Sequence, residues 1–337
     1  MMTTLHTNAP EARKLQTSGI SVVVPLYQSE AILPELVSRL EPVLRCSASD
    51  FELILVNDCS PDRTWEVMRR LAQEHAWIRP IDLMRNYGQH NALLCGIRAA
   101  RYELVVTMDD DLQHPPEEIP RLLDYIARSN YDVVYGTAER APQGFLRNLA
   151  TFATKVALRN VMGARIAREV CAFRIFRADL AAAFRHYEGS FVSIDVLLTW
   201  STDRFGALRV RHQPRQHGKS GYTFRKLITH TMNMMTGFST LPLQMASLIG
   251  FSFTLLGFAV LCYVLVRYLI HGDSVPGFPF LASIIALFSG AQLFALGIIG
   301  EYLARMYVRS MQKPPYVIRP HAAADEVNKD PPEIPRQ

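Results

Sequence analysis

Three consecutive aspartates, Asp109, Asp110 and Asp111, follow directly after the apolar run ELVVTM. Neighbouring carboxylates repel one another, and no basic residue adjoins them in the sequence. A hard divalent cation would relieve this repulsion, because Mg²⁺ and Mn²⁺ prefer oxygen ligands and leave places for substrate phosphates. Where the chain leaves a strand, Asp109 and Asp111 can face one ion while Asp110 points away, and Gln113 can add an amide oxygen. The alternative interpretation is a solvated acidic turn.

Short apolar runs alternate with helical patterns along the first part of the chain. The predicted strands are SVVVPLY, FELILVND, WIRPIDLM, ELVVTM and YDVVYGTA. Amphipathic helical patterns separate them, which predicts an α/β fold with a mostly parallel sheet covered on both faces. Ligands of such sheets bind at the carboxyl ends of the strands. The polar residues at these strand ends are Tyr27, Asn57, Asp58, Arg85, Asn86 and the three aspartates.

Several common site types are absent from the sequence. The loop PLYQSE after the first strand has no glycine, so a Rossmann dinucleotide loop is excluded, and no Walker loop is present. The net charge of +5 over 337 residues is modest and does not indicate nucleic-acid binding. The 5 cysteines are scattered without metal-ligand spacing, which fits a reducing compartment.

Two long uncharged stretches, Met245–Val266 and Phe278–Gly300, explain much of the 49% hydrophobic content. If both stretches are helical, each is long enough to cross a bilayer. The alternative interpretation is two helices buried in a protein core. The link HGDSVPG lacks Lys and Arg, and basic residues gather on the outer flanks, so both termini are expected in the cytoplasm. The polar start of the chain does not resemble a signal peptide.

These patterns predict a linear organisation. It consists of a flexible N-terminal tail (1–19), a cytoplasmic α/β domain (20–221), a juxtamembrane amphipathic helix (222–241), two transmembrane helices within 242–304 (about 243–270 and 278–300), and a cytoplasmic C-terminal tail (305–337).

The segments VVVPLY, LVNDCSPDRT, MRNYGQHNALLCGIRAA and VVTMDDDLQHPPEEIP resemble family-2 glycosyltransferases of the GT-A (Rossmann-like) fold. The likeness is strongest to the polyprenyl-phosphate branch, which includes dolichol-phosphate mannose synthase and bacterial undecaprenyl-phosphate glycosyltransferases. It runs from Ser21 to about Tyr316 and includes the two C-terminal spans. Where the family often carries glutamate, this chain has Ser29, followed by Glu30.

The resemblance implies a role for each matched residue. Residues matched to the donor nucleotide and sugar are Pro25, Tyr27, Asp58, Arg85, Gly88 and Gln89, with Asp110 counted beside them. Residues matched to the metal and diphosphate are Asp109, Asp111 and Gln113. Basic residues matched to the lipid phosphate are Arg140 and Arg147. The segment RxxGxSxY, which is expected to fold over the donor, contributes Arg215, Gly218, Ser220 and Tyr222.

The function that follows is inverting transfer of a sugar from a UDP- or GDP-sugar to polyprenyl phosphate, on the cytoplasmic face of the inner membrane, for cell-envelope glycan or lipid modification. Mg²⁺ or Mn²⁺ is the expected cofactor, the bilayer is a partner, and a homo-oligomer is compatible with the sequence. A phosphate monoester has a second pKa near 6, so such an acceptor needs no strong general base. Two alternatives stay open: transfer to a hydroxyl acceptor, which needs a base aspartate, and a non-catalytic membrane adaptor on the same fold.

Overall fold

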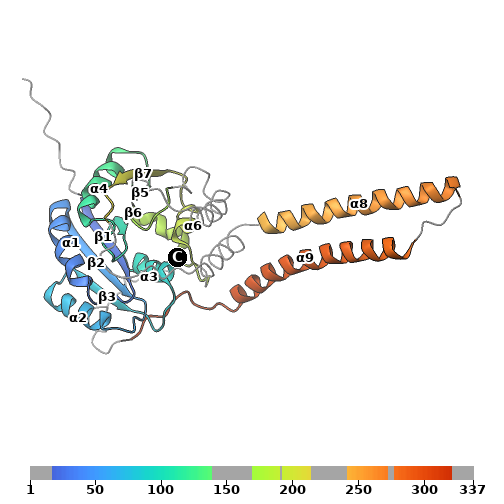
Figure 1. Ribbon diagram of the computed structural model, residues 1–337. Coiled ribbons are helices and arrows are strands. Elements are labelled where there is room, and N and C mark those ends of the chain that lie inside the picture. The colour runs from blue at the N-terminus through green and yellow to red at the C-terminus, as the bar shows by residue number, and fades with distance from the viewer. Residues whose placement is uncertain (1–16, 139–168, 190–191, 214–240, 272–276, 321–337) are drawn as a thin grey trace, which may run out of the picture.

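The computed structural model describes residues 17–138, 169–189, 192–213, 241–271 and 277–320 (Figure 1). Several sequence predictions fall outside these ranges. They concern most of the N-terminal tail, the juxtamembrane helix up to residue 240, the tail from residue 321, and six site residues: Arg140, Arg147, Arg215, Gly218, Ser220 and Tyr222.

A 7-stranded sheet forms the centre of the domain, with the order β3-β2-β1-β4-β6-β5-β7. The strands are β1 Thr17–Leu26, β2 Ala48–Asn57, β3 Ile78–Asp82, β4 Leu104–Thr107, β5 Val133–Ala138, β6 Arg174–Arg177 and β7 Phe205–Val210. Strand β6 is antiparallel to both neighbours, and the other pairings are parallel. The predicted mostly parallel α/β fold of GT-A type is therefore confirmed.

Helices cover both faces of this sheet (Figure 1). They are α1 Leu33–Ser47, α2 Thr64–Glu74, α3 Gln89–Ala99, α4 Ile119–Arg128 and α6 Ile194–Leu198. Val22 and Val24 belong to the apolar cluster under α1, α2 and α4, whereas Val23 belongs to the cluster under α3 and α6. Successive side chains of a strand point to opposite faces, and a strand buried on both faces is apolar throughout.

Strand register brings the ends of β1, β2 and β3 to one edge of the sheet. Leu26 at the end of β1 pairs with Asn57 at the end of β2, and Asn57 pairs with Asp82 at the end of β3. Strand β4 runs parallel to β1, with Thr107 beside Val23, so the aspartates that follow β4 emerge at the same edge. The loops after these four strands therefore form one continuous rim.

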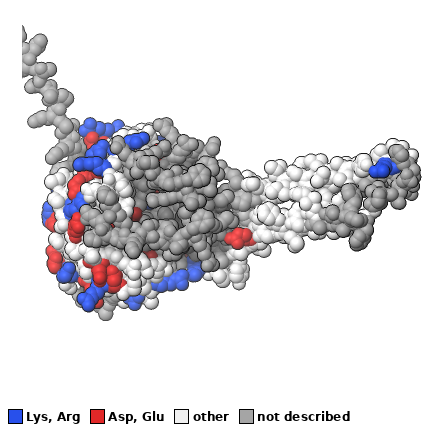
Figure 2. All heavy atoms as spheres, in the orientation of Figure 1, with Lys and Arg blue, Asp and Glu red and all other residues white. Residues whose placement is uncertain are grey.

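Two long helices, α8 Leu241–His271 and α9 Phe278–Ser310, project from the domain side by side (Figure 1). Each contains a window apolar enough to cross a membrane: Leu243–Val260 with mean hydropathy 1.7 and Leu287–Ala304 with mean hydropathy 1.4. Their visible surface is largely uncharged (Figure 2). An edge-to-face contact between Phe253 and Phe288, with ring centroids 5.9 Å apart, joins the two helices.

The last helix runs past residue 304, where the predicted membrane segment ends. Helix α9 continues to Ser310, because the sequence beyond the apolar window still consists mainly of residues that allow helix. Residues 315–320, which belong to the predicted C-terminal tail, lie against the domain, and Leu83 forms an antiparallel bridge with Ile318.

Candidate active site

A cavity of about 160 Å³ opens at the rim formed by the strand ends. Its lining residues are Pro25, Leu26, Tyr27, Asp58, Gln89, Asp109, Asp110 and Asp111. Every one of them except Leu26 was named from the sequence as a site residue. The structure thus brings together residues from the ends of β1, β2 and β4 and from the start of α3.

The aspartate loop is held by contacts on both sides. Asp109 Oδ1 accepts a hydrogen bond of 2.6 Å from Gln89 Nε2, and Asp111 Oδ1 accepts one of 3.1 Å from the Gln113 N–H. Leu112, which lies between Asp111 and Gln113, adopts a φ of 56°, and its side chain is only 1% exposed. A non-glycine residue in the left-handed region is uncommon, and here burial of the leucine side chain fixes the turn.

Ser29 links the loop after β1 to the aspartate loop. Its hydroxyl donates a hydrogen bond to the Asp110 carboxylate and accepts one of 3.1 Å from the Tyr27 N–H. Ser29 is only 1% exposed. The Ser29 N–H is bonded in turn to Thr64 Oγ1 at 2.9 Å. Asp110 therefore turns toward Ser29 while still lining the cavity. The sequence analysis noted Ser29 as a departure from the family and assigned it no role.

Asp58 organises the loop that precedes α3. Its two carboxylate oxygens accept the N–H groups of Tyr87 at 2.7 Å and of Gly88 at 2.8 Å. Burial raises the pKa of Asp58, and these two hydrogen bonds act in the opposite direction. Gly88 has a φ of 93°, which glycine adopts without steric cost. Each carboxylate oxygen has two lone pairs, so Asp58 keeps acceptor capacity toward the cavity.

Three described site residues, Arg85, Gly88 and Gln113, are not among the residues that line the cavity. Arg85 is exposed, and its guanidinium lies 4.8 Å from the centre of the Tyr87 ring. Tyr27 is 49% exposed, so part of its ring is available to a ligand. Gln113 is fixed at its backbone, since its carbonyl accepts the Gln213 N–H at 2.8 Å.

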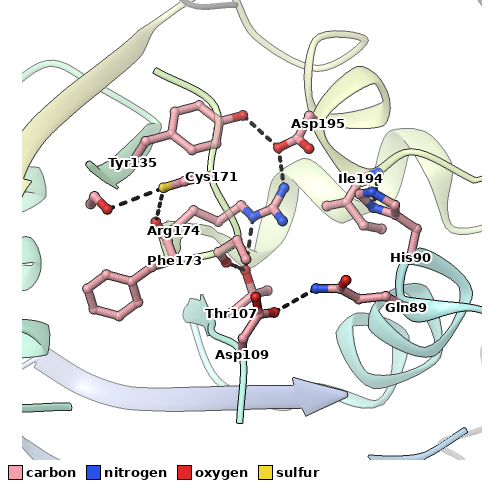
Figure 3. A network of polar contacts seen from close by, with 12 residues as sticks. Gln89, His90, Thr107, Asp109, Tyr135, Cys171, Phe173, Arg174, Ile194 and Asp195 are labelled. Atoms are coloured by element: carbon pink, nitrogen blue, oxygen red, sulfur yellow. Dashed lines mark hydrogen bonds and ion pairs between the residues drawn. The ribbon is translucent and has the colours of Figure 1, made fainter. Parts of the chain in front are cut away.

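A buried polar network lies behind the aspartates (Figure 3). The Arg174 guanidinium forms an ion pair with Asp195 and donates from Nε to Thr107 Oγ1 at 3.0 Å. The Tyr135 hydroxyl donates to the same Asp195 carboxylate at 3.0 Å. Burial alone would lower the pKa of Arg174, but the acidic groups around it, Asp195 foremost and Asp109 among them, together outweigh burial, and the net shift is upward. A permanent positive charge therefore lies close behind Asp109.

The sequence analysis missed this network. An arginine between apolar residues in CAFRIF was an available signal, because a charged residue in a buried strand requires a partner. The partner, Asp195, is 21 positions away in the chain and could not be identified without the fold. Burial raises the pKa of the nearby Cys171 thiol to about 12.

The residues present fit a hard divalent cation with an incomplete protein ligand set. Among the described residues, no group of three or more His, Cys, Asp and Glu side chains is arranged to hold a metal by itself. Asp109 and Asp111 do line one cavity and offer carboxylate oxygens, which are the ligands that Mg²⁺ and Mn²⁺ prefer. Such ions are commonly bound by one or two carboxylates together with substrate phosphates.

Comparison with known proteins gives the same class as the fold. The glycosyl transferase family 2 model matches residues 21–185. The undecaprenyl-phosphate 4-deoxy-4-formamido-L-arabinose transferase of Pseudomonas paraeruginosa is 34% identical over 302 residues, covering 89% of this chain and 89% of that protein. The protein of the same name from Pectobacterium carotovorum is 33% identical over 309 residues, covering 91% of this chain and 94% of its own length.

Likeness to solved structures is more distant. Glucosyl-3-phosphoglycerate synthase from Mycobacterium tuberculosis, solved with Mn²⁺ and UDP-glucose, aligns with a TM-score of 0.49 and 16% identity over 65% of this chain and 77% of that one. The relatives that match nearly the whole chain decide the class of protein. It is a glycosyltransferase. The chain belongs to glycosyl transferase family 2, among relatives named as undecaprenyl-phosphate sugar transferases.

Proposed function

We propose that this glycosyltransferase moves a sugar from a UDP- or GDP-sugar to undecaprenyl phosphate, or a similar polyprenyl phosphate, on the cytoplasmic face of the inner membrane. The observation that carries the proposal is a carboxylate-lined cavity on a domain joined to an apolar helical hairpin. The names of the nearly full-length relatives supply the acceptor class. The product would serve cell-envelope glycan or lipid modification.

The donor would lie along the rim with its base at the β1 and β2 end. Tyr27 offers a half-exposed ring for contact with the base, and Asp58 offers a carboxylate for the base or ribose. Gln89 donates a hydrogen bond to Asp109, which supports a role for Gln89 at the junction between nucleotide and sugar. Arg85 would contribute positive charge beside the diphosphate.

Asp109 and Asp111, with Gln113 as a further ligand, would hold Mg²⁺ or Mn²⁺ at the diphosphate. When bound, the ion would offset the negative charge of the departing nucleoside diphosphate. The protein contributes the orientation of these carboxylates. Gln89 and the Gln113 N–H fix Asp109 and Asp111, while Arg174 supplies compensating charge behind them.

The acceptor needs positioning more than activation. A phosphate monoester is largely dianionic at neutral pH, so its oxygen can attack the anomeric carbon without losing a proton to the enzyme. A hydroxyl acceptor would instead need a carboxylate as base. The buried carboxylate of Asp195 is already engaged by Arg174 and Tyr135, which favours a phosphate over a hydroxyl acceptor. Arg140 and Arg147 are proposed to hold the acceptor phosphate in line for inversion.

The hairpin α8–α9 is proposed to span the membrane, with the domain and both termini in the cytoplasm. The absence of Lys and Arg from the linker HGDSVPG supports this orientation. Reporter fusions at Gln337 and within the linker test it, since an external C-terminus would overturn the two-span topology.

The proposed activity is tested by incubating the purified protein with undecaprenyl phosphate and a panel of UDP- and GDP-sugars, with Mg²⁺, Mn²⁺ or EDTA. UDP-linked 4-deoxy-4-formamido-L-arabinose belongs in the panel because that sugar appears in the names of the relatives. The expected product is one lipid-linked sugar, detected by mass spectrometry. Transfer only to a hydroxyl acceptor would establish the first alternative. Nucleotide binding without any transfer would instead support the adaptor.

A further inference from the structure

The residues after α9 return to the domain and extend the edge of its sheet. The Met84 N–H donates to the Val317 carbonyl at 2.9 Å, and the Arg319 N–H donates to the Asp82 carbonyl at 2.7 Å. These two bonds flank the antiparallel bridge between Leu83 and Ile318. Figure 1 shows this segment running from the end of α9 to β3. Residues 315–320 are called the C-terminal strap below.

Side chains fix the strap at its last residues. The Arg319 guanidinium forms an ion pair with the Asp82 carboxylate at 2.9 Å, and Asp82 is only 6% exposed. The other oxygen of Asp82 accepts a hydrogen bond of 2.7 Å from Asn57 Nδ2, and Asn57 Oδ1 accepts the Ser60 N–H at 3.1 Å. A chain of polar contacts therefore leads from Arg319 to Asn57 and Ser60, which flank Asp58 and Cys59 in the loop after β2.

A second anchor lies at Tyr316. The Arg98 guanidinium lies 5.6 Å from the centre of the Tyr316 ring, and Arg98 also donates to the Tyr187 carbonyl at 2.7 Å. Tyr316 packs against the apolar cluster under α3, the helix whose first residue is Gln89. The strap therefore contacts the domain at α3 as well as at β3.

The donor loop from Arg85 to Gly88 is held between these anchors and Asp58. At its start, Met84 is bonded to the strap, and the Arg319 guanidinium also donates to the Met84 carbonyl at 3.4 Å. At its end, the N–H groups of Tyr87 and Gly88 are bonded to Asp58. Removing the strap would leave the Met84 N–H and the Asp82 carboxylate without these partners.

From these contacts we infer that the C-terminal strap positions the donor loop for the nucleotide, with Arg319 as its principal positioning residue. The inference rests on the proposed function. The strap also ties the nucleotide site to the membrane hairpin, because Ser310 and Ile318 are separated by 8 residue steps (318 − 310), at most roughly 28 Å of extended chain. The strap thereby limits how far the membrane hairpin and the donor site can separate.

Arg319→Ala tests this through a separation of kinetic constants. The KM for the nucleotide-sugar should rise by about 3- to 10-fold, as expected for one partly exposed charged contact. The KM for undecaprenyl phosphate and the kcat at saturating donor should stay near wild type. Arg319→Lys should restore much of the donor affinity, because lysine can still pair with Asp82. Arg128→Ala, which removes the exposed ion pair with Asp124 on α4, is the matched control.

Hydrogen exchange on the full-length protein tests the docking independently of turnover. In Arg319→Ala, the Met84 amide and the Tyr87 and Gly88 amides should exchange faster than in wild type, while the core of β1 is unchanged. Unchanged exchange in this loop, or an equal rise of both KM values, would overturn the inference. If the wild type transfers no sugar, the exchange result and the calorimetric affinity for UDP and GDP still decide whether the strap organises a nucleotide site.

Discussion

Arg174 and Asp195 form a buried ion pair directly behind the aspartate loop, joined to it through Thr107 (Figure 3). Arg174 is 1% exposed and Asp195 is 5% exposed. Because water solvates neither side chain, each charge depends on the other for compensation. Thr107 precedes Asp109 by two positions, and its hydroxyl also donates to the Ala172 carbonyl at 2.8 Å. The pair therefore connects the end of β4, strand β6 and the start of α6 at the base of the site.

Asp195→Asn should destabilise the domain while leaving the shape of the pH–rate profile unchanged. Removing one partner of a buried ion pair costs about 3–5 kcal/mol, because the other charge is left uncompensated. Asp195 is not expected to act as a base, since Arg174 and Tyr135 already occupy its carboxylate. Thermal unfolding in detergent measures the first effect, and the pH dependence of residual transfer measures the second.

A double variant separates these roles. Arg174→Met with Asp195→Leu removes both charges and should be less destabilised than Asp195→Asn alone. Loss of the acidic limb of the profile in Asp195→Asn, with stability unchanged, would identify Asp195 as a general base and favour the hydroxyl-acceptor alternative.

Asp111→Ala should abolish metal-dependent transfer without unfolding the domain. Its carboxylate lines the cavity, and loss of a ligand to the cation that offsets charge on the leaving group should lower kcat/KM by at least about 100-fold. The measurement is turnover across a titration of Mg²⁺ and Mn²⁺. Asp124→Ala, on the exposed face of α4, is the control for loss of an aspartate. Activity within a few-fold of wild type at limiting metal would exclude Asp111 as a ligand.

The rim of the site could be predicted because its chemistry is local in sequence. Asp109 to Asp111, Asp58 and Tyr27 each follow an apolar run, and parallel strands bring their carboxyl ends to one edge. The contacts that fix these residues could not be predicted in the same way. Ser29 reaches Asp110 across 81 positions and Arg98 reaches Tyr316 across 218 positions, and no periodic pattern encodes such pairs.

Strands β6 and β7 show the same limit for the fold. The sequence analysis assigned strands up to YDVVYGTA and did not assign RIFR or FGALRV. Strand β6 is short and inserts antiparallel between β4 and β5, so it breaks the regular alternation on which the prediction depended. Its two arginines, buried Arg174 and exposed Arg177, also make the strand less apolar than a typical strand of a buried sheet.

Asp132→Asn should lower the stability of the domain at neutral pH. The variant should also lose less stability than the wild type as the pH falls into the acid range. Burial alone would raise the pKa of Asp132, but hydrogen bonds from Arg204 and Thr202, with the arginine charges, outweigh it and lower the pKa. A carboxyl whose pKa is lower in the folded state contributes stability above its unfolded value near 3.8, and that contribution is lost as pH falls through the folded value.

The measurement for Asp132 is the melting temperature of wild type and variant between pH 7 and pH 3. The two curves should be separated from pH 7 to pH 5 and should converge below about pH 4. A constant separation across this range would show that the effect is steric rather than electrostatic. The Arg128–Asp124 pair, which is exposed on α4, supplies Asp124→Asn as a control with little effect at any pH.

The last prediction concerns Arg147, which lies outside the described residues and is assigned to the acceptor phosphate from the sequence. Arg147→Ala should raise the KM for polyprenyl phosphate, or lower kcat if the contact strengthens in the transition state. A charged hydrogen bond contributes roughly 1.5–3 kcal/mol, which corresponds to about 10- to 150-fold in kcat/KM. Arg147→Lys should recover activity only in part, because lysine lacks the planar fork of the guanidinium. Calorimetric binding of the nucleotide-sugar without acceptor should be unchanged, since Asp58 and the aspartate loop are proposed to hold that substrate. Equal weakening of donor binding would place Arg147 at the diphosphate, and no effect on either substrate would exclude Arg147 from both binding sites.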